Sequence, residues 1–323
     1  MDNDTADSSS GELSEKKGHS RLVSFAIRLA TEKPLGTVGA AITFILLFTG
    51  IFADFLAPYG MNETSVADSL TAPSAKFWLG TDNLGRDIFS RVIFGARISM
   101  IVGLAGTSLA TLLAVIIGIP SGYFGGKFDL IIQRVVDAFM CFPGLIFLIV
   151  LISMVGPGIW QVIVVLGLRW GITGSRVVRS ATLGIRQNVY VEAAVSVGCS
   201  PMRILTKHIL PNIMAPLIIL FSTRVPNVII TEASLSFLGF GIPPPTPSWG
   251  GMLSGAARNY MYVAPWIVIW PGIALSIVVY GVNMFGDAVR DLLDPRLIGG
   301  AVRYGVKVSK VSESKSDKKL KII

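Results

Sequence analysis

Residues 98–126 read ISMIVGLAGTSLATLLAVIIGIPSGYFGG and contain no Asp, Glu, Lys or Arg. A helix that crosses a membrane needs about 20 apolar residues, each adding roughly 1.5 Å of length. Three other runs, 36–53, 138–168 and 259–286, are also free of charge. The whole chain is 52% hydrophobic and 15% charged, whereas soluble domains are about 25% charged. This composition excludes an ordinary soluble protein and predicts a multi-pass membrane protein.

We predict an all-α membrane protein with six transmembrane helices. The start of the chain is acidic and polar rather than basic and then apolar, so we expect no cleavable signal peptide. The expected domains are a disordered N-terminal tail with the entry to the first helix (1–34), a transmembrane domain (35–296) and a basic tail (297–323). The predicted helices are 36–56, 98–121, 132–153, 159–177, 212–237 and 264–288.

Basic residues are distributed unequally between the two sides of this predicted topology. With both ends in the cytoplasm, 21 of the 28 Lys and Arg residues lie inside, 5 lie outside and 2 lie within spans. The positive-inside rule therefore predicts cytoplasmic N- and C-termini in the cell membrane. The net charge of +8 does not indicate nucleic-acid binding, because the last 21 residues hold seven basic and two acidic residues. We expect this tail to be solvated, with contact to anionic membrane lipid as the alternative.

The predicted cytoplasmic loop 178–211, between the fourth and fifth spans, reads as two short helices. Asn188 is placed to cap the first and Gly198 to end it. Ser200 and Pro201 are a cap followed by proline at the first helical position, and Pro211 is expected to end the second helix. The residues leave two interpretations open. The loop is either a mechanical element for a cytoplasmic partner or an amphipathic helix resting on the membrane.

The stretch from Tyr190 to Gly198, YVEAAVSVG, is followed after nine residues by HILPN at 208–212. This spacing resembles the EAA loop of ABC importer permeases. The segments WLGTDNLGRD (78–87), EASLSFLG (232–239) and DAVRDLLDP (287–295) are similar to the dipeptide, oligopeptide and nickel branch of that family, closest to its C-type subunit. The resemblance runs over residues 33–296.

The resemblance implies a coupling helix in the loop that docks on a separate ATPase. Small alanines would allow close approach, Gly198 would allow the turn, and Glu192 would hold the loop through a cap or an arginine contact. The alternative for Glu192 is a solvated residue in the first turn. The implied coupling residues are Tyr190, Glu192, Ala193, Ala194, Gly198, Ser200, Arg203 and Leu205. The implied partners are a homologous second permease, two ABC ATPases, an extracytoplasmic solute-binding protein and a peptide substrate.

Motifs for catalysis and for nucleotide or metal binding are absent from the sequence. The phosphate-binding loop G-x4-G-K-[ST] is missing, since the one Gly-Lys pair, Gly126-Lys127, is preceded by Ser121 at the required offset. Only two histidines and two cysteines are present, without metal-ligand spacing. We expect no catalytic residue, no metal site and no bound cofactor, with ATP and Mg²⁺ held by the partner ATPases.

Three ionisable residues fall within the predicted spans: Arg169, Arg224 and Glu232. A charge inside a membrane is costly and usually faces a cavity or a partner. These side chains are either part of a translocation path or structural contacts between helices. Arg224 and Glu232 are eight residues apart, roughly 12 Å along a helix, which is too far for a direct ion pair.

We expect the permease subunit of an ATP-driven importer for di- or oligopeptides that works by alternating access. Nickel, glutathione or an oligosaccharide are alternative solutes for the same type of importer. A self-contained secondary carrier is a second class of function, and a membrane-embedded enzyme is the least supported, because no reactive constellation is present.

Overall fold

The computed structural model describes residues 21–293, and the predicted N-terminal tail up to residue 20 and the basic tail 297–323 lie outside them. The described part is helical and contains no β-strand. Its helices are α1 (Arg21–Glu32), α2 (Pro34–Ile51), α3 (Ala53–Leu56), α4 (Ile88–Phe124), α5 (Gly126–Cys141), α6 (Gly144–Val155), α7 (Ile159–Arg186), α8 (Val189–Ser196), α9 (Pro201–Arg203), α10 (Met214–Phe237), α11 (Trp249–Met252), α12 (Ala256–Tyr260) and α13 (Trp266–Leu293).

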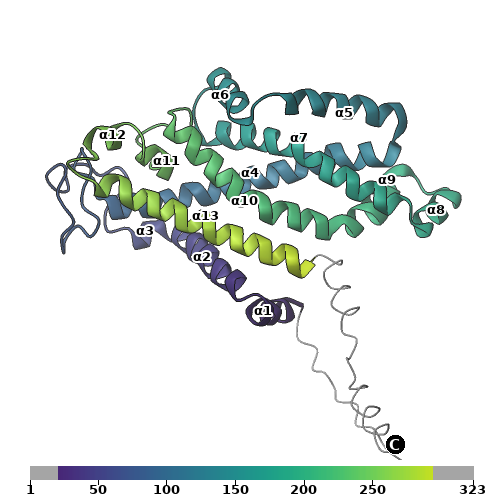
Figure 1. The fold of residues 1–323 in the computed structure, drawn as a ribbon, viewed down its shortest axis with the longest axis horizontal. Coiled ribbons are helices and arrows are strands. Elements are labelled where there is room, and N and C mark those ends of the chain that lie inside the picture. Colours follow the sequence, from purple (N-terminus) through teal and green to yellow (C-terminus); the bar gives the residue numbers. More distant parts are fainter. Residues whose placement is uncertain (1–20, 294–323) are drawn as a thin grey trace, which may run out of the picture.

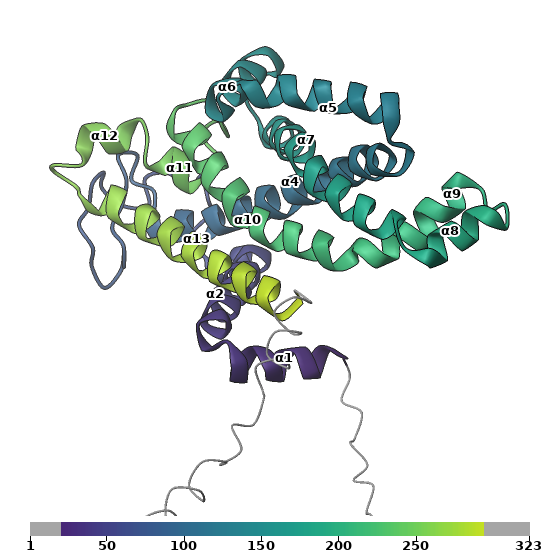
Figure 2. The ribbon, with the colours of Figure 1, turned by 45° about the vertical axis from the view of Figure 1, so that its right-hand side comes forward.

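The long helices run side by side, with small elements gathered at the two ends (Figure 1). One end carries α8 and α9, and the other carries α11, α12 and the segment between α3 and α4. Helix α1 crosses the direction of the bundle beside the last turns of α13 (Figure 2).

Four helical segments are long and apolar enough to cross a membrane: α2, α4, the run Pro201–Phe237 and α13. A fifth span results if α5 and α6 are counted as one bent segment. Helix α7 has 28 residues, enough for about 42 Å of helix, but its four arginines lower its hydropathy. The all-α membrane class is thus confirmed, while the number of six spans stays a prediction.

The predicted single helix over 132–153 is wrong. The structure bends this segment by 93° between α5 and α6. Phe142 and Pro143 lie at the bend, and Phe142 has extended backbone angles (φ −78°, ψ 134°). The ring of a proline disfavours helical geometry in the residue before it, so Cys141 is the last helical residue of α5.

Helices α4 and α7 form the most extensive helix contact in the described part of the chain. Glycines on α4 permit the close approach of their backbones. An added Cβ at Gly118 would lie 2.5 Å from the carbonyl oxygen of Ser175, and at Gly122 2.8 Å from that of Arg179. Small residues at such interfaces are a common way for membrane helices to pack.

Two ion pairs hold α5 against α7. Arg179 Nε donates to Asp129 Oδ1 at 2.6 Å, and Arg176 pairs with Asp137. Ser121, at the end of α4, also donates its hydroxyl to Asp129. Asp129 therefore connects three helices at one point.

Replacing Asp129 by asparagine is expected to destabilise the protein by about 2 kcal/mol, because Arg179 loses its counter-charge in a partly buried position. The side chains of Arg179 and Asp129 are only 30% and 14% exposed, so solvent screens the lost attraction incompletely. Thermal unfolding of the purified protein in detergent should show a midpoint several degrees lower. Arg134→Gln is the matched control, since Arg134 is 76% exposed and lies 3.8 Å from Asp137. Equal midpoints for the two variants would contradict the role of Asp129.

Candidate functional site

The loop between α7 and α10 forms a tip at one end of the bundle (Figure 1). Its first element, α8, has eight residues. Glu192 lies in its first turn, and Glu192 and Ala193 are both exposed. Apolar side chains are exposed as well: Val189 by 80%, Val197 by 84% and Met202 by 69%. Exposed apolar groups clustered at one tip are typical of a surface that contacts a partner.

The opposite face of the loop is packed into the bundle. Val191, Ile204 and Ile209 are each at most 1% exposed. They belong to one apolar cluster with side chains of three long helices. Its other buried members are Ala114 and Ile119 of α4, Val178 of α7, Ile213 just before α10, and Leu217 and Leu220 of α10. The inner face of the loop therefore contacts α4, α7 and α10 at once. We call these nine buried side chains the loop cluster.

The end of α8 shows why glycine stands at position 198. The backbone N–H of Gly198 donates to Val195 O, and that of Cys199 donates to Ala194 O. Gly198 has φ +82°. This pair of bonds, with a left-handed residue between them, is the Schellman termination, which glycine adopts without steric strain.

Three details of the predicted loop are wrong. Asn188 and Ser200 occupy the N-cap positions of α8 and α9, but neither side chain makes a capping hydrogen bond. Pro211 does not end the second helix, because Pro201–Phe237 is one continuous helical run. Within that run, a π-helical turn spans Ile204–Ile209 and a 3-10 turn spans Leu210–Ile213. These changes of helix type accommodate the proline without a break.

The other predicted coupling residues are spread over both faces of the loop. Tyr190, Ser200 and Arg203 are exposed, whereas Ala194 and Leu205 are half-buried against the loop cluster. The ring of Tyr190 lies 6.5 Å from that of His208. Within residues 21–293 the Glu192 carboxylate makes no hydrogen bond or ion pair, so the expected cap or arginine contact is not formed among these residues.

The structure brings two of the three intramembrane ionisable residues together. The guanidinium carbon of Arg224, on α10, lies 4.5 Å from the ring centroid of Trp170 on α7. That of Arg169 lies 5.9 Å from the same ring. A guanidinium stacked on an indole gains a cation–π attraction that fixes its orientation. Trp170 was not singled out from the sequence, because its partner is 54 positions away and no periodicity links them.

Glu232 is not part of that group. It is 1% exposed, and its Oε1 accepts a 2.7 Å hydrogen bond from Ser236 Oγ. Ser236 Oγ in turn accepts from the backbone N–H of Ile242. The carboxylate thus ties the end of α10 to the segment that follows it. No ion pair joins Glu232 to Arg224 in the described residues, in agreement with the predicted separation.

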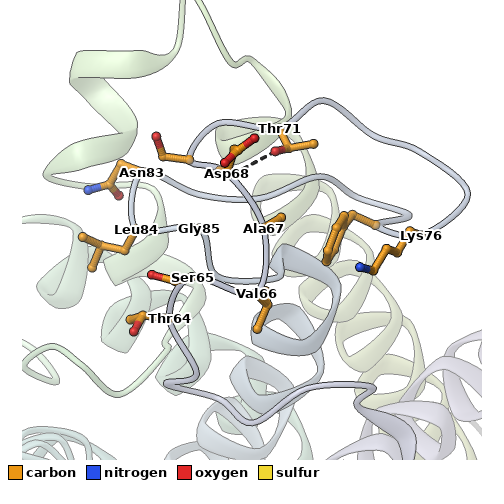
Figure 3. A pocket seen from close by; sticks show the side chains of 12 residues that line it. Thr64, Ser65, Val66, Ala67, Asp68, Thr71, Lys76, Asn83, Leu84 and Gly85 are labelled. Carbon is orange, nitrogen blue, oxygen red and sulfur yellow. Dashed lines mark hydrogen bonds between the residues drawn. The ribbon is translucent and has the colours of Figure 1, made fainter.

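The segment between α3 and α4 covers the other end of the bundle. It surrounds a hollow of about 900 Å³, in which the side chains of Ser65, Asp68 and Lys76 lie around the rim (Figure 3). Asp82 holds this segment in place: its carboxylate accepts from Arg86 Nε at 2.7 Å and lies 3.8 Å from Arg91 Nε. Among residues 21–293, no group of three His, Cys, Asp or Glu side chains is arranged to hold a metal ion.

The loop tip lies in a region of the sequence that is similar to a known family. The sequence profile described as binding-protein-dependent transport system inner membrane component matches residues 114–299. The chain belongs to this family. It is therefore the permease subunit of an ABC importer, a multi-pass membrane protein that works with further subunits. The matched region contains the loop tip, Trp170 and both arginines.

Individual relatives agree with the family assignment. A protein of Brucella suis biovar 1 named as a peptide transport system permease is 38% identical over 280 residues, covering 87% of this permease and 94% of the relative. The glutathione transport system permease protein GsiD of Pectobacterium atrosepticum is 40% identical over 261 residues, covering 80% and 86%. An inward-facing structure of the MetNI methionine ABC transporter superposes with a TM-score of 0.51 at 18% identity, covering 63% of this permease and 96% of that chain. The last likeness concerns the fold alone.

Proposed function

We propose that this permease moves di- or oligopeptides across the cytoplasmic membrane, with both chain ends in the cytoplasm. The names of two relatives support a peptide-like solute, since one is called a peptide permease and the other a glutathione permease. Glutathione, itself a small peptide, is the second candidate.

The observation that supports ATP-driven transport is the loop tip, with its exposed α8 and its buried inner face. In this proposal α8 inserts into an ABC ATPase, and the exposed side chains of Glu192 and Ala193 lie in the contact. Tyr190, Ser200 and Arg203 border it. Ala194 and Leu205 face the bundle and join α8 to the loop cluster, while Gly198 sets the turn that returns the chain to α10.

The same geometry supports a mechanism for transmitting force. When two ATPases close on ATP, the docked α8 moves with its ATPase. The loop cluster is close-packed, so the displacement passes to α4, α7 and α10 rather than being absorbed locally. Motion of these helices would open the path alternately to each side of the membrane.

The remaining components of the proposed importer are a second permease, a binding protein and the ATPases. A homologous second permease would complete the path, and an extracytoplasmic binding protein would deliver the solute to the end formed by α11, α12 and the segment before α4. This chain would break no bond. ATP and Mg²⁺ would be held by the two ATPase subunits.

The test is a reconstituted complex in proteoliposomes, with peptide uptake and ATP hydrolysis measured side by side. Glu192→Ala and Gly198→Val should each reduce uptake at least tenfold while ATP hydrolysis continues and the amount of permease stays unchanged. An added Cβ at Gly198 meets nothing within 4 Å, so any loss comes from the altered turn and not from a clash inside the chain. The exposed control is Lys127→Ala at the start of α5.

Normal coupled uptake by both variants would reject the docking role. Ion-driven uptake by this chain alone, without ATPases, would instead indicate a secondary carrier. Stimulation of the complex by a binding protein loaded with glutathione but not with peptides would favour the second solute.

A further inference from the structure

Arg169 and Arg224 differ in their partners from two other arginines of α7. Arg176 and Arg179 on α7 are paired with Asp137 and Asp129. Neither Arg169 nor Arg224 forms an ion pair within the part of the chain that the structure describes. Both guanidinium groups lie within 6 Å of the ring centroid of Trp170. Two cations on one ring in a weakly polar setting repel each other, and an anion between them would relieve that repulsion.

Arg169 and Trp170 also carry unused hydrogen-bond donors. Arg169 Nε and Trp170 Nε1 are buried and have no acceptor among residues 21–293. Most buried polar groups in proteins have a hydrogen-bond partner. We therefore expect these two donors on adjacent residues to bind an acceptor. A group with several acceptor oxygens would satisfy them together with the guanidinium of Arg224.

A groove leads from Arg224 to the end of the bundle. It has a volume of about 690 Å³ and is bordered by α7, α10 and α13. Its lining includes Arg224, Thr223, Asn227, Arg290 and Leu293. Arg169 and Trp170 do not line it, and Arg224, which stacks on Trp170, connects them to it. No acidic side chain of the described residues lines it. Its volume is in the range of small-molecule sites, and its charge suits an anion.

We propose that Arg169, Trp170 and Arg224 form a transient binding site for the carboxylate group of the transported solute. This inference rests on the proposed function, since it assumes that the groove is part of the solute's route. The planar guanidinium matches a carboxylate with two parallel hydrogen bonds. Stacking on Trp170 orients the guanidinium groups before the solute arrives. Sites near the middle of the membrane are typical of transporters.

The proposal discriminates between the candidate solutes. Peptides and glutathione both carry carboxylates and fit the site. A divalent nickel ion would be repelled by two arginines, and a neutral oligosaccharide would gain nothing from their charge. The arginine pair therefore selects a carboxylate-bearing solute without choosing between the two candidates named by the relatives.

The first experiment measures binding to the assembled complex without its binding protein, by saturation-transfer difference NMR. The probes are tri-alanine and tri-alanine amide, which differ in the terminal carboxylate. Tri-alanine should bind, and the amide should bind at least tenfold more weakly. Arg224→Met and Arg169→Met should each abolish the difference between the probes, whereas Arg224→Lys should restore part of it. The matched control is Arg258→Met, because Arg258 also stacks on an aromatic ring, but on that of Phe237 at 4.6 Å rather than that of Trp170.

Equal binding of the two probes, or an unchanged preference in Arg224→Met, would overturn the proposal. An acidic residue of the second permease is the competing partner for Arg224. In that case the wild-type complex would not bind tri-alanine, and Arg224→Met would lower the amount of assembled complex.

A second readout separates this site from the proposed function. In proteoliposomes with loaded binding protein, Arg224→Met should lower tri-alanine uptake at least tenfold while the binding protein still stimulates ATP hydrolysis. Failure of the wild-type complex to take up any peptide would contradict the proposed peptide importer. The carboxylate site would then still be decided by the NMR comparison of tri-alanine with its amide. Normal uptake by Arg224→Met would reject the site alone.

Discussion

Replacing Gly118 by valine is expected to leave almost no folded permease in the membrane. An added Cβ at this position would lie 2.5 Å from Ser175 O and 3.0 Å from Arg179 N, both backbone atoms of α7. A backbone cannot rotate away as a side chain can, so α4 and α7 would have to separate. Overpacking commonly costs about 1–3 kcal/mol, and separating the most extensive helix pair should exceed that range. Such a loss is a large part of a typical stability of about 5–15 kcal/mol.

The measurement is the amount of detergent-soluble, monodisperse permease recovered from membranes. The matched control is Gly184→Val on α7, where an added Cβ meets nothing within 4 Å. The control should be recovered at the wild-type level. Wild-type recovery of Gly118→Val would show that the α4 and α7 backbones are less tightly opposed than the structure indicates.

Replacing Ala193 by tryptophan is expected to abolish uptake, by at least a hundredfold, without reducing the amount of permease. Ala193 is exposed on α8, so the larger side chain extends into solvent and the fold has no reason to change. The loss would arise only where the ATPase must approach α8 closely. In contrast to Gly118→Val, this variant should unfold at the wild-type temperature.

The matched control for Ala193→Trp is Lys127→Trp, which places the same side chain at another exposed position, in the first turn of α5. Co-purification of the ATPase with the permease provides a second measurement, since Ala193→Trp should lose the ATPase and Lys127→Trp should retain it. Retention of the ATPase and full uptake by Ala193→Trp would place the docking surface elsewhere.

The sequence allowed the loop to be predicted in its main features. The spacing from Glu192 to Pro211 placed a short helix, a glycine turn and a second helix where the structure has them. The expected caps at Asn188 and Ser200 were wrong because capping depends on side-chain rotamers as well as position. The continuity of the helix through Pro211 could not be predicted, since it depends on the wider π turn just before it.

Helix boundaries were less predictable where charges have distant partners. Helix α4 begins at Ile88, ten positions before the charge-free run, and it includes Arg91 and Arg97. Arg91 donates to Met61 O, and Arg97 donates to Gly50 O and pairs with Asp54. These acceptors lie in segments distant in the sequence, so the sequence alone does not show that the two charges are paired. A prediction based on charge-free runs therefore places both arginines in a loop.

The candidate site was also only partly predictable from the sequence. Arg169 and Arg224 are recognisable as charges within apolar runs, but only the packing of α7 against α10 brings Arg224 onto Trp170, the neighbour of Arg169. The bend at Phe142 and Pro143 is a different case. A proline disfavours helical geometry in the residue before it, so Pro143 is a local signal from which the bend could have been predicted.

The unbroken helical run Pro201–Phe237 has a consequence for how the loop tip and the intramembrane arginines are linked. It has 37 residues, or about 55 Å at the usual rise, and it carries Arg224 on the same rod as the loop tip. Between Met202 and Arg224 the run changes helix type twice, at Ile204–Ile209 and at Leu210–Ile213, but it is not broken. A displacement near Met202 would therefore reach Arg224 through these two turns. Solute binding at Arg224 and movement of the docked loop would then be linked mechanically through one continuous helical run.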